Sequence, residues 1–111
     1  CAEPTPDNLV YVCDRPNDRI QVFNKDGKFV KEKQVAPRTL GDGSVWDIAF
    51  SADAAQKYLY VADGMNQKVR ILDRASLTEL AAFGDGGLYA ERRIERAELP
   101  TERVRELLSA G

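Results

Sequence analysis

Leu-Val-Tyr-Val-Cys-Asp at residues 9–14 returns 49 positions later as Tyr-Leu-Tyr-Val-Ala-Asp at residues 58–63, and this repeat decides the fold. In both stretches apolar residues lead up to an aspartate, Asp14 in the first and Asp63 in the second. The match continues along the chain, where Asn17 falls on Asn66, Arg19 on Lys68, Ile20 on Val69, Val22 on Ile71 and Phe23 on Leu72. One unit of sequence is therefore used twice.

Each unit reads as short strands separated by tight turns, because alternating β-branched and aromatic residues are bounded by Asp, Asn, Pro and Gly. In the first unit this pattern predicts three strands, at residues 9–13, 19–24 and 28–35, with a hairpin turn at residues 24–27. In the second unit it predicts four strands, at residues 45–50, 58–62, 68–73 and 79–83.

A four-stranded antiparallel meander that recurs about every 40 to 50 residues is typical of the blades of a β-propeller. The chain resembles the NHL-repeat propellers, whose blades carry a pattern like Leu59-Tyr60-Val61-Ala62-Asp63, then Asn66-Gln67-Lys68-Val69, and close with a Phe-Gly pair like Phe83-Gly84. Residues 8–30 carry a similar pattern. The resemblance covers about residues 8–87, and it implies two propeller-type antiparallel blades of three and four strands.

The composition changes after Gly87, because residues 88–111 hold five Glu and five Arg but no Asp or Lys. Strong helix formers fill residues 88–99, and Thr101 can cap a second helix at residues 102–110. The apolar stripes of these helices consist of Tyr89, Ile94, Ala97, Val104, Leu107 and Leu108. We therefore expect a two-blade β region (1–87) and a helical tail (88–111) that packs on the same domain or on a neighbouring subunit, mainly β with a C-terminal helical hairpin and α+β overall. Such Glu/Arg helices with clean caps are typical of designs, which indicates a chimera built from a propeller fragment.

The paired aspartates and asparagines have a structural interpretation. Asp14 and Asp63 end a predicted strand, and Asn17 and Asn66 follow three residues later. We expect each carboxylate to accept N–H bonds in the turn, with the asparagine completing it. A calcium site would require further oxygen ligands that the sequence does not gather, so we expect no metal and no cofactor.

Basic residues near the strand ends are the candidates for a binding face. In NHL-like propellers, loop-exposed basic and aromatic residues bind RNA, peptides or proteins, and the resemblance therefore points to Arg15, Arg19, Lys68 and Arg70. The alternative is that Arg19 and Lys68 lie on solvated strand faces. The net charge of −2 argues against a nucleic-acid partner. Trp46 lies beside Ile48 in a predicted strand, and we expect it to pack between blades rather than to stack on a ligand.

Catalytic motifs are not visible in the sequence. The glycine-rich stretch at residues 40–44 lacks the Lys-Ser/Thr of a P-loop. The chain contains no His, so neither the histidine-bound zinc of the amidating-lyase propellers nor a Ser-His or Cys-His pair can be built. We therefore predict that the chain is not an enzyme and has no catalytic residues.

The two cysteines leave two alternatives open. Cys1 and Cys13 form a disulfide if the N-terminal arm folds back along the first strand, or Cys13 is a buried thiol beside a disordered end. The longest apolar runs span only a few residues, well below the roughly 20 that cross a bilayer, so we expect a soluble protein without a membrane partner. The cellular compartment is left open.

Two isolated blades leave apolar sheet faces and strand edges to be covered. Either three chains associate into six blades, or the helical tail packs over the sheet. The predicted function is a non-catalytic scaffold or binding module derived from an NHL-like propeller, whose partner is another copy of the chain or another protein. The alternatives are a module that recruits a partner through its amphipathic tail, and a remnant of a propeller hydrolase or lyase.

Overall fold

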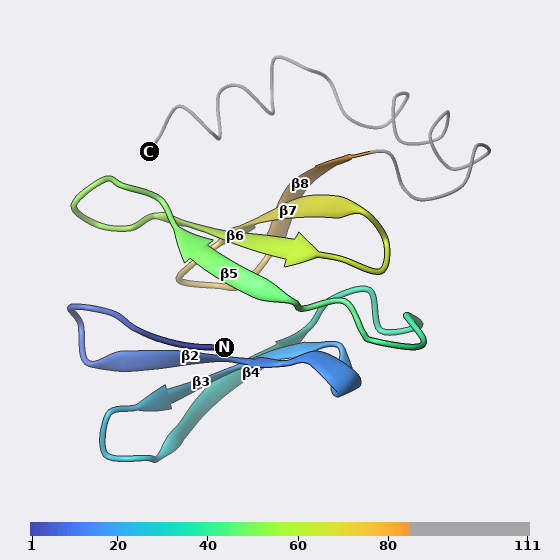
Figure 1. The fold of residues 1–111 in the computed structure, drawn as a ribbon. Coiled ribbons are helices and arrows are strands. Elements are labelled where there is room, and N and C mark those ends of the chain that lie inside the picture. The colour runs from blue at the N-terminus through green and yellow to red at the C-terminus, as the bar shows by residue number, and fades with distance from the viewer. Residues whose placement is uncertain (85–111) are drawn as a thin grey trace.

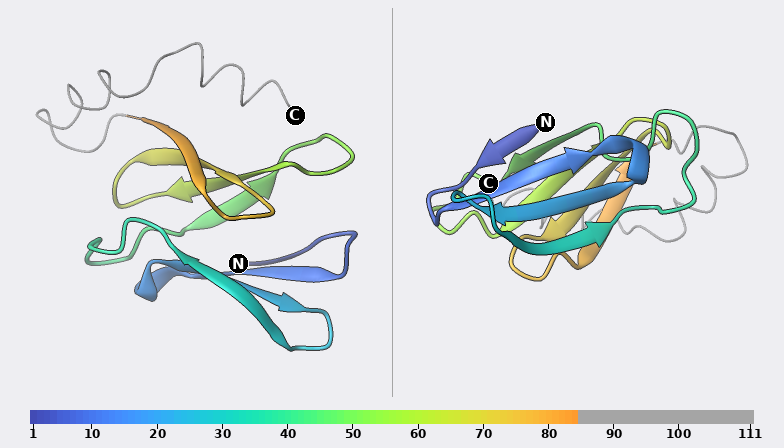
Figure 2. Two further views of the ribbon diagram at one scale, coloured as in Figure 1. Left: turned by 180° about the vertical axis from the view of Figure 1, so that it is seen from behind. Right: turned by 90° about the horizontal axis from the view of Figure 1, so that it is seen from below.

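Both repeat units form a four-stranded antiparallel meander in the computed structural model, which describes residues 1–84 (Figure 1). The first sheet consists of β1 (Ala2–Pro4), β2 (Leu9–Asp14), β3 (Arg19–Asn24) and β4 (Phe29–Gln34). The second sheet consists of β5 (Asp47–Phe50), β6 (Tyr58–Asp63), β7 (Lys68–Asp73) and β8 (Glu79–Gly84). In each sheet, strands that follow one another in sequence pair with one another, and the two sheets stack face to face (Figures 1 and 2).

The fold class predicted from the sequence is wrong in two respects. The described residues are all β apart from a 3-10 turn at Arg15–Asn17, so the class is mainly β rather than α+β. The first sheet has four strands rather than three, because β1 is too short to show the alternation by which strands are recognised. The other seven strands match their predicted bounds within two residues. The helices expected at residues 88–99 and 102–110 lie outside the described residues, and within residues 1–84 no helix is long and apolar enough to cross a membrane.

A disulfide between Cys1 and Cys13 holds β1 against β2. The two Cα atoms are 5.0 Å apart, and the backbone N–H of Cys13 donates to the carbonyl of Cys1 at 2.9 Å. The N-terminal arm therefore folds back along β2, and of the two alternatives for the cysteines the disulfide is the one that forms.

The repeat is visible in the backbone as well as in the sequence. Asp18 and Gln67, 49 positions apart, both have a φ of 55°. Their N–H groups donate to the carbonyls of Arg15 at 3.1 Å and Gly64 at 3.2 Å, which closes the same turn in both units. The register shift between β3 and β4 follows Val22, and that between β7 and β8 follows the equivalent residue, Ile71. The two units therefore share their turn and their bulge.

The main core lies between the two sheets. Tyr11 is fully buried and its ring packs edge-on against Phe50 of the other sheet, with ring centroids 5.2 Å apart. Each fully buried aliphatic or aromatic side chain contributes about 1.5–3 kcal/mol to the free energy of unfolding. The apolar interface between the two sheets is therefore the main source of stability. The buried core residues are Tyr11, Ile20, Val22, Val35, Val45, Ile48, Leu59, Val61, Leu72 and Leu77.

Arg74 adds a polar connection between the sheets. It follows β7, and its guanidinium donates to the Asp7 carboxylate at 3.0 Å and to the Tyr11 hydroxyl at 3.2 Å in the first unit. The same guanidinium donates to the carbonyl of Gln56 at 2.6 Å in its own unit. The Thr5 hydroxyl, and after it Arg74, lower the pKa of Asp7. Arg74 therefore satisfies polar groups of both units at one point.

Removal of the disulfide is expected to destabilise the first sheet. For a loop of this length the chain-entropy model gives a loss of about 2–4 kcal/mol in the free energy of unfolding. The double variant Cys1→Ser/Cys13→Ala, which leaves no free thiol, should show this loss in urea denaturation followed by circular dichroism. Reduction of the wild-type protein should lower its stability by a similar amount, and unchanged stability of both samples would contradict the role given to the disulfide.

Candidate binding face

Three connecting segments meet at one end of the stacked sheets, at the right in Figure 1. They are the 3-10 turn Arg15–Asn17 between β2 and β3, the connection at residues 35–46 between β4 and β5, and the turn at residues 64–67 between β6 and β7. The first turn belongs to the first unit and the last to the second, so this end of the molecule contains residues of both units.

Trp46 occupies the junction between these segments. The guanidinium of Arg15 lies over its ring, 4.5 Å from the centroid, and its indole N–H donates to the Gly43 carbonyl at 2.8 Å. The indole ring also packs directly against Gly64. Any larger residue at position 64 would place its Cβ only 2.0 Å from the ring, so this position requires glycine. Trp46 contacts residues of both units, yet 39% of its surface is exposed and it does not belong to the core, so it is not buried between the blades as the sequence led us to expect.

Two more apolar side chains are exposed on the connecting segments that meet at this end. Leu40 is 83% exposed and Met65 is 43% exposed. The Met65 methyl group approaches Gly41, where a Cβ would lie 3.2 Å away, and Met65 adjoins Gly64 beneath Trp46. We call the surface formed by Arg15, Leu40, Trp46 and Met65 the loop face. It holds three of the five large exposed apolar side chains of residues 1–84.

The long connection that carries Leu40 is anchored at several points. Asp18 is buried, and its carboxylate accepts the N–H of Ser44 at 2.9 Å while its carbonyl accepts the N–H of Val35 at 2.7 Å. The side-chain amide of Asn66 donates to the Thr39 hydroxyl at 2.8 Å. Because these bonds fix the connection before any ligand arrives, little ordering is left to oppose binding.

A hollow of about 350 Å³ adjoins the loop face. Arg38 is exposed at its rim, and Asn66 and Arg70 line its wall. The hollow places the exposed Arg38 on the same connecting segment as Leu40, whereas Arg70 is buried and engaged by carboxylates. The residues that line it are Ala36, Pro37, Arg38, Thr39, Asn66 and Arg70.

The paired aspartates and asparagines lie in the equivalent turns. The Asn17 side-chain amide donates to both oxygens of Asp14 at 3.1 Å. In the second unit the amide of Asn66 donates to both oxygens of Asp63, at 3.1 and 2.9 Å, and its backbone N–H donates to the same carboxylate at 3.2 Å. Both carboxylates are thus occupied within their own turn. Among residues 1–84 no three His, Cys, Asp or Glu side chains are grouped so that they could hold a metal ion.

The arginines that pair with these aspartates come from different positions of the repeat. Asp14 pairs with Arg19 at 2.5 Å near the surface, and this contact is the main cause that lowers the pKa of Asp14. Asp63, which is fully buried, pairs instead with Arg70 at 2.8 Å. Arg70 also reaches Glu79 at 3.2 Å. The second unit therefore has a buried ion pair where the first has a half-exposed one.

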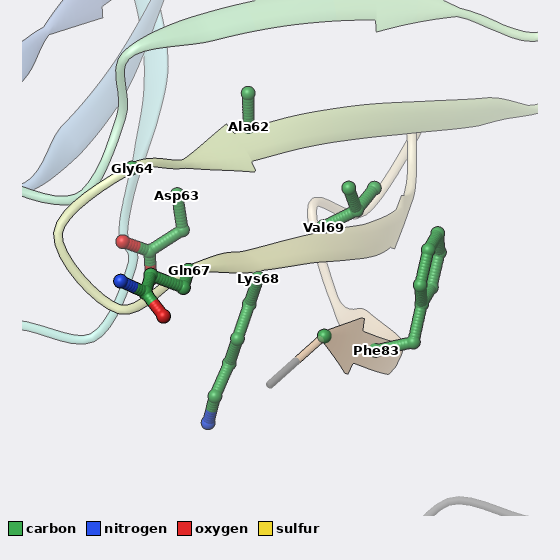
Figure 3. Close-up of a pocket in the computed structure, with 8 residues that line it drawn as sticks. Ala62, Asp63, Gly64, Gln67, Lys68, Val69 and Phe83 are labelled. Atoms are coloured by element: carbon green, nitrogen blue, oxygen red, sulfur yellow. The ribbon is translucent and has the colours of Figure 1, made fainter. Parts of the chain in front are cut away.

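The four basic residues predicted for a binding face do not come together on one surface. Arg15 lies on the loop face. Arg19 and Arg70 are engaged by carboxylates, and Arg70 contributes only to the wall of the polar hollow. Lys68 lines a different hollow, of about 230 Å³, with Ala62 and Phe83 (Figure 3).

Sequence reasoning did not identify Leu40 or Met65. The sequence offered one weak signal for each residue. Leu40 is a single apolar residue in a long connection, and Met65 is an apolar residue within the turn between Asp63 and Asn66. Neither shows a periodic pattern, because both lie outside strands. Their proximity arises only when the two sheets pack.

The comparisons with known proteins support the fold and nothing finer. No family model and no curated protein matches the sequence. The structure resembles that of apo AztD from Citrobacter koseri, a β-propeller-like protein, with a TM-score of 0.53 and 16% sequence identity. The match covers 74% of this chain and 21% of the AztD chain, so the chain spans about a fifth of that protein.

The residues that the structure describes therefore have the architecture of two adjacent antiparallel blades, similar to part of a propeller-like protein. At this level of identity the likeness concerns the fold alone. The function must be argued from the surfaces of this chain.

Loss of the buried ion pair of the second unit should lower the free energy of unfolding more than loss of the half-exposed pair of the first unit. In Arg70→Met the Asp63 carboxylate stays buried without its cation, and we expect a loss of about 3–5 kcal/mol in the free energy of unfolding. The matched variant Arg19→Met breaks a half-exposed pair and should cost less than about 1 kcal/mol. Urea denaturation measures both, and equal losses would contradict the difference in burial.

Gly64→Ala tests the packing of Trp46. The new methyl group would overlap the indole, so we expect a shift of the tryptophan emission and a loss of about 1–3 kcal/mol in the free energy of unfolding. Trp46 is the only tryptophan in the chain, which makes its emission a direct reporter. In the Trp46→Ala background the same substitution should cost much less, and additive losses in this double-mutant cycle would show that the two residues do not interact.

Proposed function

We propose that this chain is a non-catalytic binding module of NHL-like propeller type, and that its loop face binds a protein partner. The observation that carries the proposal is the cluster of Leu40, Trp46 and Met65 beside Arg15 on one anchored surface. Grouped exposed apolar side chains mark interaction sites. Tryptophan and arginine are enriched among the residues that dominate binding energy, and methionine adapts to differing partner surfaces.

The neighbouring hollow indicates which chemical groups the partner should carry. Arg38 is exposed there, and Arg15 presents a second guanidinium over Trp46. A peptide segment with apolar side chains and a carboxylate would cover Leu40 and Met65 while it pairs with Arg38. The net charge of −2 disfavours nucleic acid as the partner.

The remaining parts of the proposal depend on the sequence. The NHL-type assignment relies on the repeated pattern that ends at Asp14 and Asp63. The absence of catalysis relies on the lack of His, and the Cys13 thiol is committed to a disulfide. The chimeric origin relies on the Glu/Arg composition of residues 88–111.

Selection of peptides from a random displayed library on the immobilised protein tests the loop face. We expect enriched peptides that combine apolar and acidic residues, and we expect Leu40→Ser and Met65→Ser to weaken their binding about tenfold or more, or about 1.4 kcal/mol. Isothermal titration calorimetry gives the dissociation constants. Val30→Ser is the matched control, because Val30 is 42% exposed but lies on β4, outside the loop face.

Two results would contradict the proposal. One is a set of selected peptides whose affinity is insensitive to Leu40→Ser and Met65→Ser. The other is an equal loss in Val30→Ser, which would indicate general stickiness of exposed apolar side chains rather than a site.

A further inference from the structure

Met65 carries the sulfur atom of this chain that is open to oxidation. The sequence contains one methionine and two cysteines, and the two cysteines are joined in the Cys1–Cys13 disulfide. Peroxides oxidise a thioether directly, whereas a disulfide offers no thiolate to them. The Met65 side chain is 43% exposed, so small oxidants reach it from solvent. Oxidation of sulfur in this chain is therefore concentrated on the loop face.

The Met65 side chain joins the turn at residues 64–67 to the connection at residues 35–46. A Cβ at Gly41 would lie 3.2 Å from the Met65 methyl carbon and 3.8 Å from its sulfur, so both atoms pack on the backbone of Gly41. A thioether is only a weak hydrogen-bond acceptor. This contact between the two segments therefore depends on van der Waals packing.

The same segments are also joined through Arg15 and Trp46. The Nε–H of Arg15 donates to the carbonyl of Asp42, the residue after Gly41, at 3.0 Å, and the Arg15 guanidinium lies over the Trp46 ring. Trp46 packs in turn on Gly64, the residue before Met65. These contacts form a closed series with the packing of Met65 on Gly41. A displacement of Met65 therefore changes the surroundings of the indole.

The turn that carries Met65 does not require a methionine. The residue 49 positions before it is Pro16, at the centre of the 3-10 turn Arg15–Asn17. Both turns are followed or closed by a residue with a φ of 55°, Asp18 in the first unit and Gln67 in the second. The backbone conformation forms with either residue, so the thioether contributes to the loop face rather than to the turn.

We propose that Met65 is a site of oxidation to the sulfoxide, and that this modification opens the loop face. The sulfur lone pair attacks one oxygen of hydrogen peroxide, so that an S–O bond forms while the O–O bond breaks. The hydroxide that leaves takes a proton and becomes water. The thioether loses two electrons and the peroxide gains them, and sulfoxide reductases reverse the step with two thiols, which become a disulfide as water is released.

The sulfoxide weakens the contact that Met65 makes. Its oxygen is a polar acceptor, and it gives up hydrogen bonds to water if the side chain stays packed on Gly41. The side chain therefore turns to solvent, and the loop face loses one of its three exposed apolar side chains. The effect on binding rests on the proposed function, because a partner that covers Met65 binds the oxidised loop face less tightly.

Treatment of the whole chain with dilute hydrogen peroxide tests the site. Mass spectrometry should show the gain of one oxygen atom, which tandem spectra should place at Met65. The emission of Trp46, the only tryptophan, should shift as the contacts around the indole loosen. In isothermal titration calorimetry the oxidised chain should bind the selected peptides about tenfold less tightly. A saturating peptide should slow the oxidation, because it covers the side chain.

Met65→Leu is the matched control. Leucine keeps an apolar side chain at this position and lacks the thioether. The emission and the peptide affinity of this variant, each compared before and after peroxide treatment, should not change. An equal change in Met65→Leu would assign the effect to another residue and would overturn the proposal.

Three further outcomes would overturn the proposal. Met65 that remains a thioether, while free methionine in the same solution is consumed, would show that the side chain is shielded. Complete conversion to the sulfoxide with unchanged Trp46 emission would show that the contact with Gly41 survives oxidation. Unchanged peptide affinity of the oxidised chain would show that the modification does not control binding. If no peptide is enriched, the proposed function fails, and the mass and the emission still decide whether oxidation opens the loop face.

Discussion

Burial of one face of each sheet against the other is the contact on which the remaining features depend. Neither four-stranded sheet can hide both of its faces with its own strands, and the contact that runs from Tyr11 on β2 to Leu72 on β7 removes the largest apolar side chains from water. The same contact brings the turns of the two units to a common end. Arg15 of the first unit therefore reaches Trp46 at the start of the second, and a surface forms that neither unit has alone.

Polar groups at the edges of this contact tie the units together without enlarging the core. Arg74 reaches Asp7 across the interface, and Asp18 holds the connection through Ser44. Asp18 and Ser44 are buried, so the hydrogen bond between them must be made for the connection to pack against the sheets. The turn aspartates of the two units have different ionic partners. Asp63 is buried more deeply than Asp14, and its partner Arg70 comes from the middle of β7.

The interface has a direction, which distinguishes stacked blades from a symmetric sandwich. A sandwich of two equal sheets would bury equivalent faces. Here the face of the first sheet that carries Tyr11 packs on the face of the second sheet that carries Leu59, and the residue equivalent to Leu59 in the first sheet is Val10, on the opposite face from Tyr11. Repetition of such a contact turns each sheet in the same sense, and this is the geometry by which propeller blades follow one another. The likeness to part of AztD agrees with this arrangement at the level of fold.

The amino-acid sequence by itself determined the repeat, seven of the eight strands within residues 1–84 and the turns at Asp14 and Asp63, because these depend on alternation and local hydrogen bonding within a few residues. It did not predict β1, whose three residues carry no periodic signal, nor the fold class of the described chain. Only the tertiary structure decided which arginine serves each aspartate and which exposed residues share a surface. Met65 approaches Gly41, the residue after Leu40, because tertiary packing rather than any local pattern sets the distance between their loops.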